Sequence, residues 1–227
     1  MTRLARALAV LATVVVLGSG AVAVAVYVTE SGPSRPGAGD VADGQVVTGE
    51  EQDATFEVPS ADQGWTVRPS AAVVYYVDET GQPLIGVAGP AVYDAGYCPE
   101  AEGASNRAFV GFTRSLRGVD VAAANEQLTA EFVAGISLSQ DGTGRHEAGP
   151  VTTEPTSLAD GAAAVRSTTE VRLTQRGPCE PARVRLDLVT FESGDRVVTL
   201  ALVRDVGRGS VPDSIAESIL QSLRKRT

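Results

Sequence analysis

The sequence predicts an α+β domain, a mostly antiparallel β-sheet with two helices, that follows an N-terminal membrane segment. Short runs of alternating apolar and polar residues recur between residues 55 and 203, separated by turn residues. This period is typical of strands that bury one face. Two stretches, 120–136 and 210–226, change to the helical period. An uncharged run of 22 residues, from Ala7 to Val28, precedes all of them and is long enough to span a bilayer as a helix.

The N-terminal segment, 1–28, is expected to be an uncleaved transmembrane anchor. Arg3 and Arg6 precede the apolar run and a net acidic region follows it, which places the short N-terminus inside and the rest of the chain outside. A cleaved signal peptide is the alternative, because residues 21–25 offer small side chains suited to a cleavage site. Both interpretations put residues from about 30 onward outside the cytoplasm, in a single-pass membrane protein or a secreted one.

Residues 29–54 are expected to be a flexible tether, and residues 55–227 the extracytoplasmic domain. The tether stretch is rich in Gly, Pro, Ser and acidic residues and shows no apolar period. As a coil it would span roughly 25 to 30 Å, enough to lift a domain clear of the lipid headgroups.

The first half of the domain predicts short strands followed by a helix. Alternating runs lie at 55–58, 65–67, 71–77, 84–88 and 107–116. The turn "DETGQP" joins the third and fourth runs, which indicates a hairpin. In the stretch 120–136, Asp120 is placed to cap the first helical turn. The apolar face of this helix is expected to consist of Val121, Leu128, Phe132 and Ile136.

The second half predicts three antiparallel strands. In the stretch 164–176, charged and hydroxyl side chains alternate with apolar ones, so this strand has one wet face. The stretch 183–191 alternates in the same way and fits an antiparallel partner. If Cys179 and Glu180 centre the turn, Arg172 lies opposite Asp187 as an ion pair. The stretch 196–203 is apolar at nearly every position, as expected of a central strand.

A helix is expected to close the chain. Ser210 can cap it and Pro212 suits its first turn. Its apolar stripe is expected to be Ile215, Ile219, Leu220 and Leu223. The basic run Arg224–Arg226 is expected in the last turn, where cations interact favourably with the carbonyl end of a helix.

Composition excludes several classes of function. The net charge is −9, which repels phosphate backbones, and the single dense basic run already has a structural explanation, so nucleic acid is not expected as a partner. His146 is the only histidine and is interpreted as an exposed turn residue. One histidine and two distant cysteines do not make a usual metal site. Since no phosphate-binding loop is present either, no cofactor is expected.

Cys98 and Cys179 are the only cysteines, 81 positions apart. In an oxidising compartment they pair most simply with each other, with an intermolecular bond as the alternative. The intramolecular bond would stabilise the domain by at most roughly 4.5 kcal/mol in the chain-entropy model. A nucleophilic role is not expected, because no histidine lies nearby to lower the pKa of a thiol.

Tyr93, Asp94 and Tyr97 surround Cys98 and are a candidate recognition surface. A tyrosine offers apolar area with a polar tip, which suits contact with a partner. The alternative is that both rings cover the edge of the sheet.

Two stretches resemble known families. "FEVPSADQGWTV" at 56–67 and "IAESILQSLR" at 215–224 resemble the opening and close of PsbP-like and LpqN-type extracytoplasmic domains. Trp65, the stretch 83–98 and the anchor with its tether resemble more closely an uncharacterised actinobacterial family of membrane-anchored domains. The resemblance implies an α-β-α sandwich outside the membrane that binds partners or assists assemblies. LpqN-type proteins are usually lipoproteins, whereas this sequence has no cysteine directly after its apolar run to carry a lipid.

Together these observations predict a non-catalytic, membrane-tethered extracytoplasmic module for binding or assembly. Its expected partners are the cell membrane, through the N-terminal helix, and an envelope protein. The alternative is a cell-envelope hydrolase that uses paired carboxylates, since 28 acidic residues leave room for such a pair.

Overall fold

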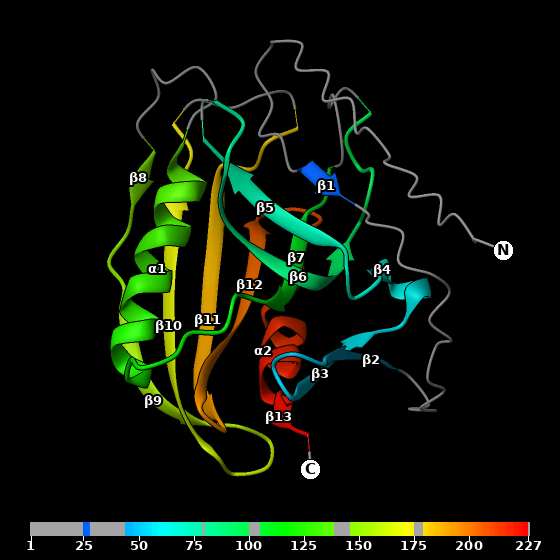
Figure 1. Cartoon of the computed structure of the whole chain (residues 1–227). Helices are drawn as coiled ribbons and strands as arrows, with labels where there is room; N and C mark the ends of the chain where they lie inside the picture. Colours follow the sequence, from blue (N-terminus) through cyan, green and yellow to red (C-terminus); the bar gives the residue numbers. More distant parts are fainter. Residues whose placement is uncertain are drawn as a thin grey trace, which may run out of the picture.

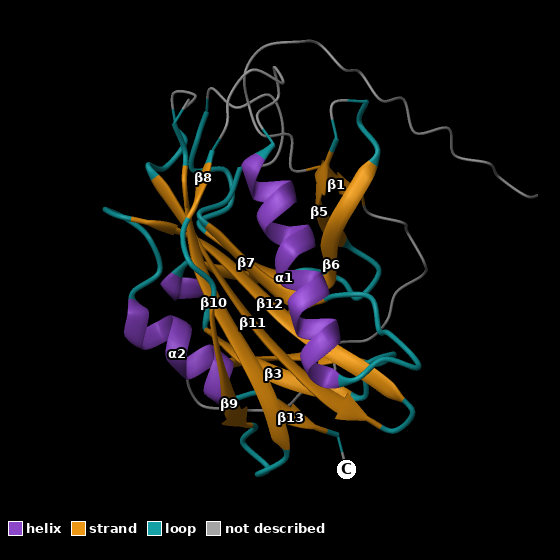
Figure 2. Ribbon diagram, turned by 90° about the vertical axis from the view of Figure 1, so that its left-hand side faces the viewer, coloured by secondary structure: helices purple, strands orange, loops and turns teal. Residues whose placement is uncertain are grey.

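The computed structural model describes residues 25–27, 44–78, 80–99, 105–138, 146–174 and 179–226. Within these residues, ten strands form one antiparallel sheet and three strands form a second, smaller sheet. The large sheet lies in the middle of the molecule, with one helix on each side of it (Figures 1 and 2). The expected mostly antiparallel sheet with two helices is confirmed.

The large sheet has the order β1-β5-β6-β7-β12-β11-β10-β8, with β4 paired to β6 and β9 paired to β10. Its strands are β1 (Ala25–Tyr27), β4 (Trp65–Val67), β5 (Val73–Val77), β6 (Pro83–Tyr93), β7 (Ala108–Phe112), β8 (Glu147–Ala148), β9 (Thr152–Ser157), β10 (Ala163–Arg172), β11 (Arg183–Ser193) and β12 (Arg196–Val206). The small sheet has the order β13-β3-β2, and its strands are β2 (Gly44–Gly49), β3 (Ala54–Pro59) and β13 (Arg224–Lys225). A 3-10 turn, η1 (Ala61–Gln63), links β3 to β4.

Each face of the large sheet has its own apolar core. Helix α1 (Val121–Ser137) covers one face, where Leu128 and Phe132 pack with side chains of β5–β7 and β10–β12. Helix α2 (Asp213–Gln221) and the small sheet cover part of the other face, where Phe56 and Leu220 are buried. Because α2 and the small sheet together form one outer layer, the molecule is a three-layer sandwich.

Helix α1 begins as its sequence predicts, and three of its four expected apolar side chains, Leu128, Phe132 and Ile136, are buried, whereas Val121 is partly exposed. The carboxylate of Asp120 accepts a hydrogen bond from Ala123 N at 2.9 Å, which satisfies one of the free N–H groups of the first turn. The helix also carries a buried polar contact, since Asn125 Nδ2 donates to Thr190 Oγ1 of β11 at 2.9 Å. This contact fixes the position of α1 along the sheet in addition to apolar burial.

The antiparallel pairing of β10 with β11 is confirmed, but the predicted register is wrong. Arg172 lies opposite Arg183, and Asp187 lies opposite Thr168. The partner of each residue is four positions away from the expected one. An even shift leaves every side chain on the same face of the sheet, so the polar and apolar alternation could not distinguish the two registers.

The predicted tether extends too far into the chain. Residues 44–49 form β2, which pairs with β3 and buries Val47. A Cβ atom on Gly49 would lie 2.5 Å from the Phe112 ring, so a side chain at this position would displace the core. The folded part therefore begins at or before Gly44 rather than at Thr55; the Gly-rich and acidic surroundings hid this short strand.

The C-terminus also departs from expectation. The Ser210 hydroxyl donates to Gly207 O rather than capping α2, and Pro212 occupies the N-cap position. Arg224 and Lys225 form β13 beside β3, so they do not extend the last turn of a helix. Helix α2 ends at Gln221, and after the fully buried Leu223 the basic run continues along the small sheet.

The predicted membrane segment lies mostly outside the described residues. Its last part, Ala25–Tyr27, is the short strand β1, antiparallel to β5. Among the described residues, none of the helices has the length and apolar character needed to cross a bilayer. The anchor at 1–28 stays a prediction.

Candidate ligand-binding site

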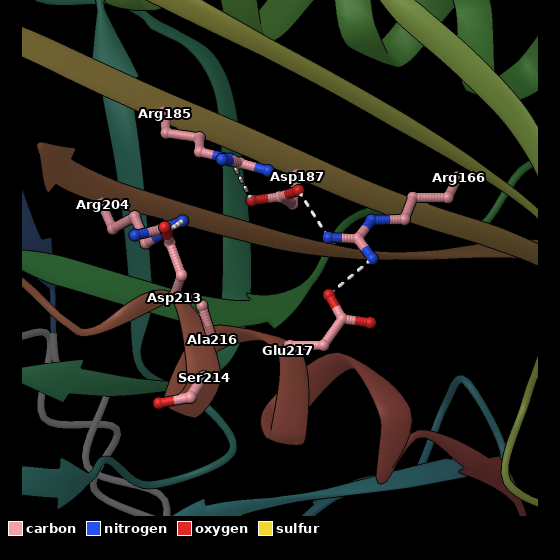
Figure 3. A pocket seen from close by; sticks show the side chains of 8 residues that line it. All are labelled: Arg166, Arg185, Asp187, Arg204, Asp213, Ser214, Ala216 and Glu217. Carbon is pink, nitrogen blue, oxygen red and sulfur yellow. Dashed lines mark hydrogen bonds and ion pairs between the residues drawn. The ribbon is translucent and has the colours of Figure 1, made fainter.

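A pocket of about 340 Å³ lies between the polar face of β10–β12 and the first two turns of α2 (Figure 3). We call it the charged pocket. Its lining consists of Arg166, Arg185, Asp187, Arg204, Asp213, Ser214, Ala216 and Glu217. Three arginines and three carboxylates therefore meet in a space the size of a small molecule.

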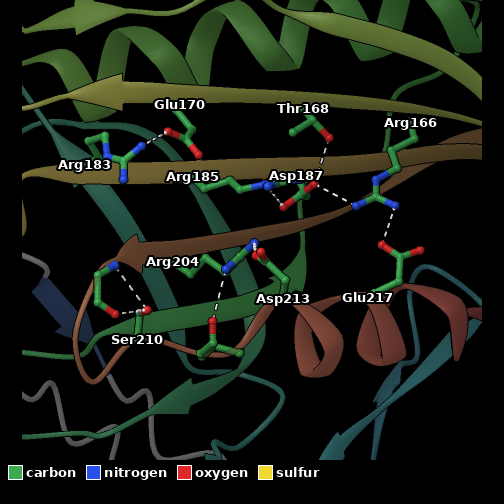
Figure 4. Close-up of polar contacts among 12 residues, drawn as sticks. Arg166, Thr168, Glu170, Arg183, Arg185, Asp187, Arg204, Ser210, Asp213 and Glu217 are labelled. Atoms are coloured by element: carbon green, nitrogen blue, oxygen red, sulfur yellow. Dashed lines mark hydrogen bonds and ion pairs between the residues drawn. The ribbon is translucent and has the colours of Figure 1, made fainter.

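Strand alternation and antiparallel register bring these residues together. Arg166 of β10, Arg185 and Asp187 of β11, and Arg204 of β12 project to the same face of the sheet. The apolar core under α2 and the small sheet occupies one part of this face. The part of this face that the core does not cover is polar, as predicted for the stretch 164–176. It carries charged side chains from neighbouring strands (Figure 4).

Asp187 is the centre of the pocket floor, and its side chain is only 1% exposed. Its Oδ1 accepts hydrogen bonds from Arg166 Nη2 at 2.9 Å and from Thr168 Oγ1 at 2.8 Å. Arg185 Nε lies 3.3 Å from its Oδ2. A carboxylate this deep needs such partners, because the loss of hydration on burial is otherwise very costly.

Arg166 extends this contact to α2. Its Nη1 donates to Glu217 Oε2 at 2.7 Å, so its guanidinium bridges the carboxylates of Asp187 and Glu217. Burial lowers the pKa of Arg166, but its hydrogen bonds to the two carboxylates outweigh burial, and the net effect is a raised pKa.

Arg204 joins β12 to the start of α2. Its side chain is buried, donates to Val211 O at 3.1 Å and makes a short hydrogen bond to Asp213 Oδ1. The hydrogen bond and charge of Arg204 lower the pKa of Asp213, with a smaller contribution from the charge of Arg185. Asp213 lies in the first turn of α2, where the helix dipole also favours a negative charge.

Arg185 differs from the other two arginines. Arg204 lies directly opposite it on β12, a like-charge pair that is unfavourable across strands. Its side chain is 28% exposed, and its contact with Asp187 is an ion pair through Nε. Neither of its Nη groups has a hydrogen bond to a residue in the part of the chain that the structure describes. Arg185 therefore presents unused donors to the pocket.

A second hollow, between β8, β9 and β10, adjoins the charged pocket and shares Arg185 as a lining residue. Its rim contains another like-charge pair, Arg172 opposite Arg183. Glu147 lies 3.7 Å from Arg172, and Glu170 lies 3.0 Å from Arg183. Arg185 thus lies where two hollows of the same sheet face meet.

The structure brings two of the three predicted recognition residues together. Arg107 Nε donates to Asp94 Oδ2 at 2.9 Å, and the Arg107 guanidinium lies 4.2 Å from the centre of the Tyr97 ring. Tyr93 is not part of this group, because its ring packs on Trp65 with centroids 5.5 Å apart. Tyr93 pairs with strands on both sides and packs against the apolar core, so its ring does not cover an edge of the sheet.

Cys98 and Cys179 form a disulfide with a Cα–Cα distance of 5.8 Å. The Tyr97 hydroxyl donates to Cys179 O at 2.8 Å, which ties the loop after β6 to the start of the chain segment that leads into β11. The expected structural pairing of the two cysteines is therefore present.

A buried acid that the sequence analysis missed lies beside this group. Asp205, near the end of β12, has a side chain that is 12% exposed, and Arg107 Nη1 lies 3.9 Å from its Oδ2. Burial raises the pKa of Asp205 to about 7; Arg107 opposes this rise and Asp94 adds to it. Burial, and then the charge of Asp205, raise the pKa of the Tyr76 hydroxyl.

Neither metal binding nor a histidine-based site is supported among the described residues. No group of three or more His, Cys, Asp or Glu side chains there is arranged to hold a metal ion. His146 is partly buried rather than exposed, and its Nδ1 accepts a hydrogen bond from Thr174 N at 3.2 Å.

Most of the charged pocket could not be identified from the sequence. Arg166 and Asp187 were placed on polar faces, but nothing indicated that Arg185 and Glu217 would meet them. One signal was available, since Arg204 and Asp205 end an otherwise apolar central strand. Charges at the end of a buried strand point to a polar site or a solvent-exposed end.

The fold and pocket define a class: an antiparallel α+β sandwich with a charged pocket beside its second helix. Residues 38–227 match the model of the family described as "Domain of unknown function (DUF8017)", and the chain belongs to this family. No curated protein matches the chain. Among solved structures it is similar to the solution structure of cyanobacterial PsbP (CyanoP) from Synechocystis sp. PCC 6803, with 13% identity and a TM-score of 0.43 over 85% of this chain and 98% of that chain.

Proposed function

We propose that this protein is a non-catalytic binding module outside the cytoplasm, tethered to the cell membrane by residues 1–28, and that its ligand carries an oxyanion group that binds Arg185. The observation that carries this proposal is Arg185 itself. It is a partly buried arginine placed opposite Arg204, with both Nη groups unused by the described residues.

The ion pair with Asp187 explains only the Nε group of Arg185 and leaves both Nη groups without a structural role among the described residues. Like charges opposite each other on neighbouring strands are unfavourable, and buried ion pairs are weak contributors to stability compared with apolar side chains of similar volume. A guanidinium, by contrast, matches carboxylate and phosphate groups through two parallel hydrogen bonds. A local arrangement that weakens the fold is expected where the sequence serves a binding site.

The proposed location rests on the disulfide and on the character of the N-terminal run. Disulfides persist in oxidising compartments, which suits a domain carried outward by an N-terminal anchor. The sequence resemblance to membrane-anchored actinobacterial domains agrees with this arrangement, and an envelope component is the proposed partner.

The hydrolase alternative gains no support from the carboxylates that lie together. Arg166 lies between Asp187 and Glu217, and Arg107 lies between Asp94 and Asp205. A glycosidase needs its two carboxyl groups to face each other across the substrate. In both pairs an arginine occupies the space that the bond to be cleaved would need.

The proposal is tested by photo-crosslinking in intact cells. A photoreactive amino acid at Ser214, on the pocket rim, is expected to give an adduct that mass spectrometry detects and that disappears in an Arg185→Gln background. The same amino acid at Asp195, in the turn between β11 and β12, is the control position. Adducts that are equal with and without Arg185 would contradict a ligand in this pocket.

The location is tested by adding protease to whole cells, with a known external protein as the positive control. The domain is expected to be degraded together with that control. Survival of the domain while the control is degraded would contradict the location.

A further inference from the structure

We propose that the ligand of the charged pocket is dipolar: a small zwitterion, such as the free ends of a short peptide, with its carboxylate on Arg185 and its ammonium group on Glu217. This inference rests on the proposed function, since it assigns the chemical class of ligand to the same pocket.

The charges of the pocket floor form a row that alternates in sign. Arg185 contacts Asp187 at 3.3 Å, Asp187 contacts Arg166 at 2.9 Å, and Arg166 contacts Glu217 at 2.7 Å (Figures 3 and 4). The two inner groups are held on both sides. The two outer groups, Arg185 and Glu217, have one neighbour each within the row, so the row ends in a cation on β11 and an anion on α2.

Both ends of the row are open to a ligand. The Glu217 side chain is 42% exposed, and besides Arg166 it accepts a hydrogen bond from the exposed Gln221 amide at 3.1 Å. At the other end, Arg185 offers its Nη groups. A ligand that lies along the row with its anionic group at Arg185 and its cationic group at Glu217 would pair with both end residues.

The wall formed by α2 carries a second carboxylate near Glu217, that of Asp213, which is paired with Arg204. Asp213 and Glu217 are four residues apart and therefore share one side of the helix. Arg204 lowers the pKa of Asp213, so the Asp213 carboxylate stays charged. The Oδ2 atom of Asp213 accepts no hydrogen bond from a described residue. The positive end of the helix dipole acts mainly within the first turn, where Asp213 offsets it. The helix dipole therefore does not oppose an ammonium group beside Glu217, in the second turn.

The size of the pocket restricts the ligand. Two residues of extended peptide span roughly 7 Å between their ends. A pocket of about 340 Å³ holds a dipeptide-sized molecule but not a folded partner. A short peptide end or an amino acid conjugate fits both the volume and the charge pattern.

The test uses three dipeptides of matched size, titrated into the full chain in detergent micelles at low ionic strength. L-alanyl-L-alanine carries both charges, N-acetyl-L-alanyl-L-alanine has no ammonium group, and L-alanyl-L-alaninamide has no carboxylate. Binding is followed by isothermal calorimetry and by the amide NMR signals of residues 213–217. We expect the zwitterion to bind about tenfold or more tightly than either blocked peptide, since each charged contact contributes at least that factor.

Variants separate the two ends. Glu217→Gln is expected to reduce the affinity for the zwitterion to that of the acetylated peptide and to leave the acetylated peptide unchanged. Arg185→Gln is expected to abolish binding of both. Glu126→Gln, on the exposed side of α1, is the control and should change neither.

Equal affinity for the zwitterion and the acetylated peptide would overturn the dipolar ligand but leave an oxyanion on Arg185 intact. Binding of the zwitterion that Glu217→Gln does not weaken would overturn the assignment of the ammonium site. Absence of binding by all three peptides would also overturn this inference, whereas the crosslinking experiment judges the proposed function separately.

Discussion

Two buried aspartates lie on adjacent strands, Asp187 on β11 and Asp205 on β12. Their carboxylates differ in the number of hydrogen-bond and ion-pair partners. Asp187 receives hydrogen bonds from Arg166 and Thr168 and an ion pair from Arg185. Asp205 has Arg107 at 3.9 Å, and its Oδ2 has no hydrogen-bond donor among the described residues. The Oδ2 atoms of both carboxyl groups lack a hydrogen bond from the described residues, but only Asp187 accepts side-chain hydrogen bonds and has two guanidinium groups close by.

Burial alone therefore does not define a site in this protein. At Asp187, opposite charges compensate for the lost hydration and leave a fixed row of alternating charges. At Asp205 that compensation is weak, and burial raises the pKa of the carboxyl group to about 7. The first region is a polar surface of paired charges, and the second is a carboxyl group whose pKa of about 7 lies near neutral pH.

The largest effect is expected from Asp187→Asn. The substitution keeps the shape of the side chain but leaves Arg166 and Arg185 without their shared counter-charge. Removal of one partner of a buried ion pair costs about 3 to 5 kcal/mol of unfolding free energy. Urea unfolding at pH 7 measures this loss. A change below about 1 kcal/mol would mean that Asp187 does not hold the row together.

Asp205→Asn is expected to stabilise the protein at high pH. The pKa of Asp205 is about 7 in the folded state and near 3.8 when unfolded, so folding favours the protonated form. The folded state therefore loses stability as pH rises from about 4 to about 7, by up to roughly 4 kcal/mol. The variant removes this penalty.

The thermal midpoint of the Asp205→Asn variant should exceed that of the natural protein at pH 8, and the difference should shrink to about a quarter at pH 4.5. The difference between the two proteins isolates Asp205 from the other carboxylates. A midpoint difference that is constant between pH 4.5 and pH 8 would show that Asp205 does not titrate in this range.

A double substitution, Arg166→Met with Asp187→Leu, separates the cost of an unpaired charge from the net contribution of the row. Both charges are removed together and replaced by apolar side chains, so the unfolding free energy is expected to stay within about 2 kcal/mol of the natural protein. The unfolding free energy of the double variant should then exceed that of the Asp187→Asn variant. A double variant as unstable as the single one would show that the charged row is itself a net stabilising element of the fold.

The smallest effect is expected from Arg117→Gln, which removes an exposed ion pair with Asp195. Such pairs contribute about 0 to 1 kcal/mol, and salt screens them. Urea unfolding at low and high salt provides the measurement. A loss as large as that of Asp187→Asn would remove the distinction between buried and exposed pairs.

The sequence was most informative where alternation and helical period are strong. The strands of the second half, α1 with its Asp120 cap, and the disulfide between Cys98 and Cys179 were predictable from local pattern or composition. The sequence was least informative where two different structures fit the same alternation of polar and apolar residues. The register of β10 against β11 is an example, because a shift by an even number of residues leaves every side chain on the same face of the sheet.

The charged pocket shows the same limit for function. Arg185 and Glu217 line one pocket only because α2 packs over strands that precede it in the chain. No spacing in the sequence encodes that approach. Tyr97 and Asp94 are neighbours in sequence, yet the group that joins them, Arg107, lies at the start of the next strand.

The role of Arg185 as a binding residue is decided by the unfolding free energy of the Arg185→Gln variant beside the natural protein. If Arg185 serves a ligand, its removal relieves repulsion with Arg204 but also takes one ion-pair partner from Asp187, which keeps Arg166 and Thr168, so stability should fall by less than about 1 kcal/mol. A loss of about 2 kcal/mol or more would show that Arg185 holds the fold together, and would contradict its assignment as a binding residue.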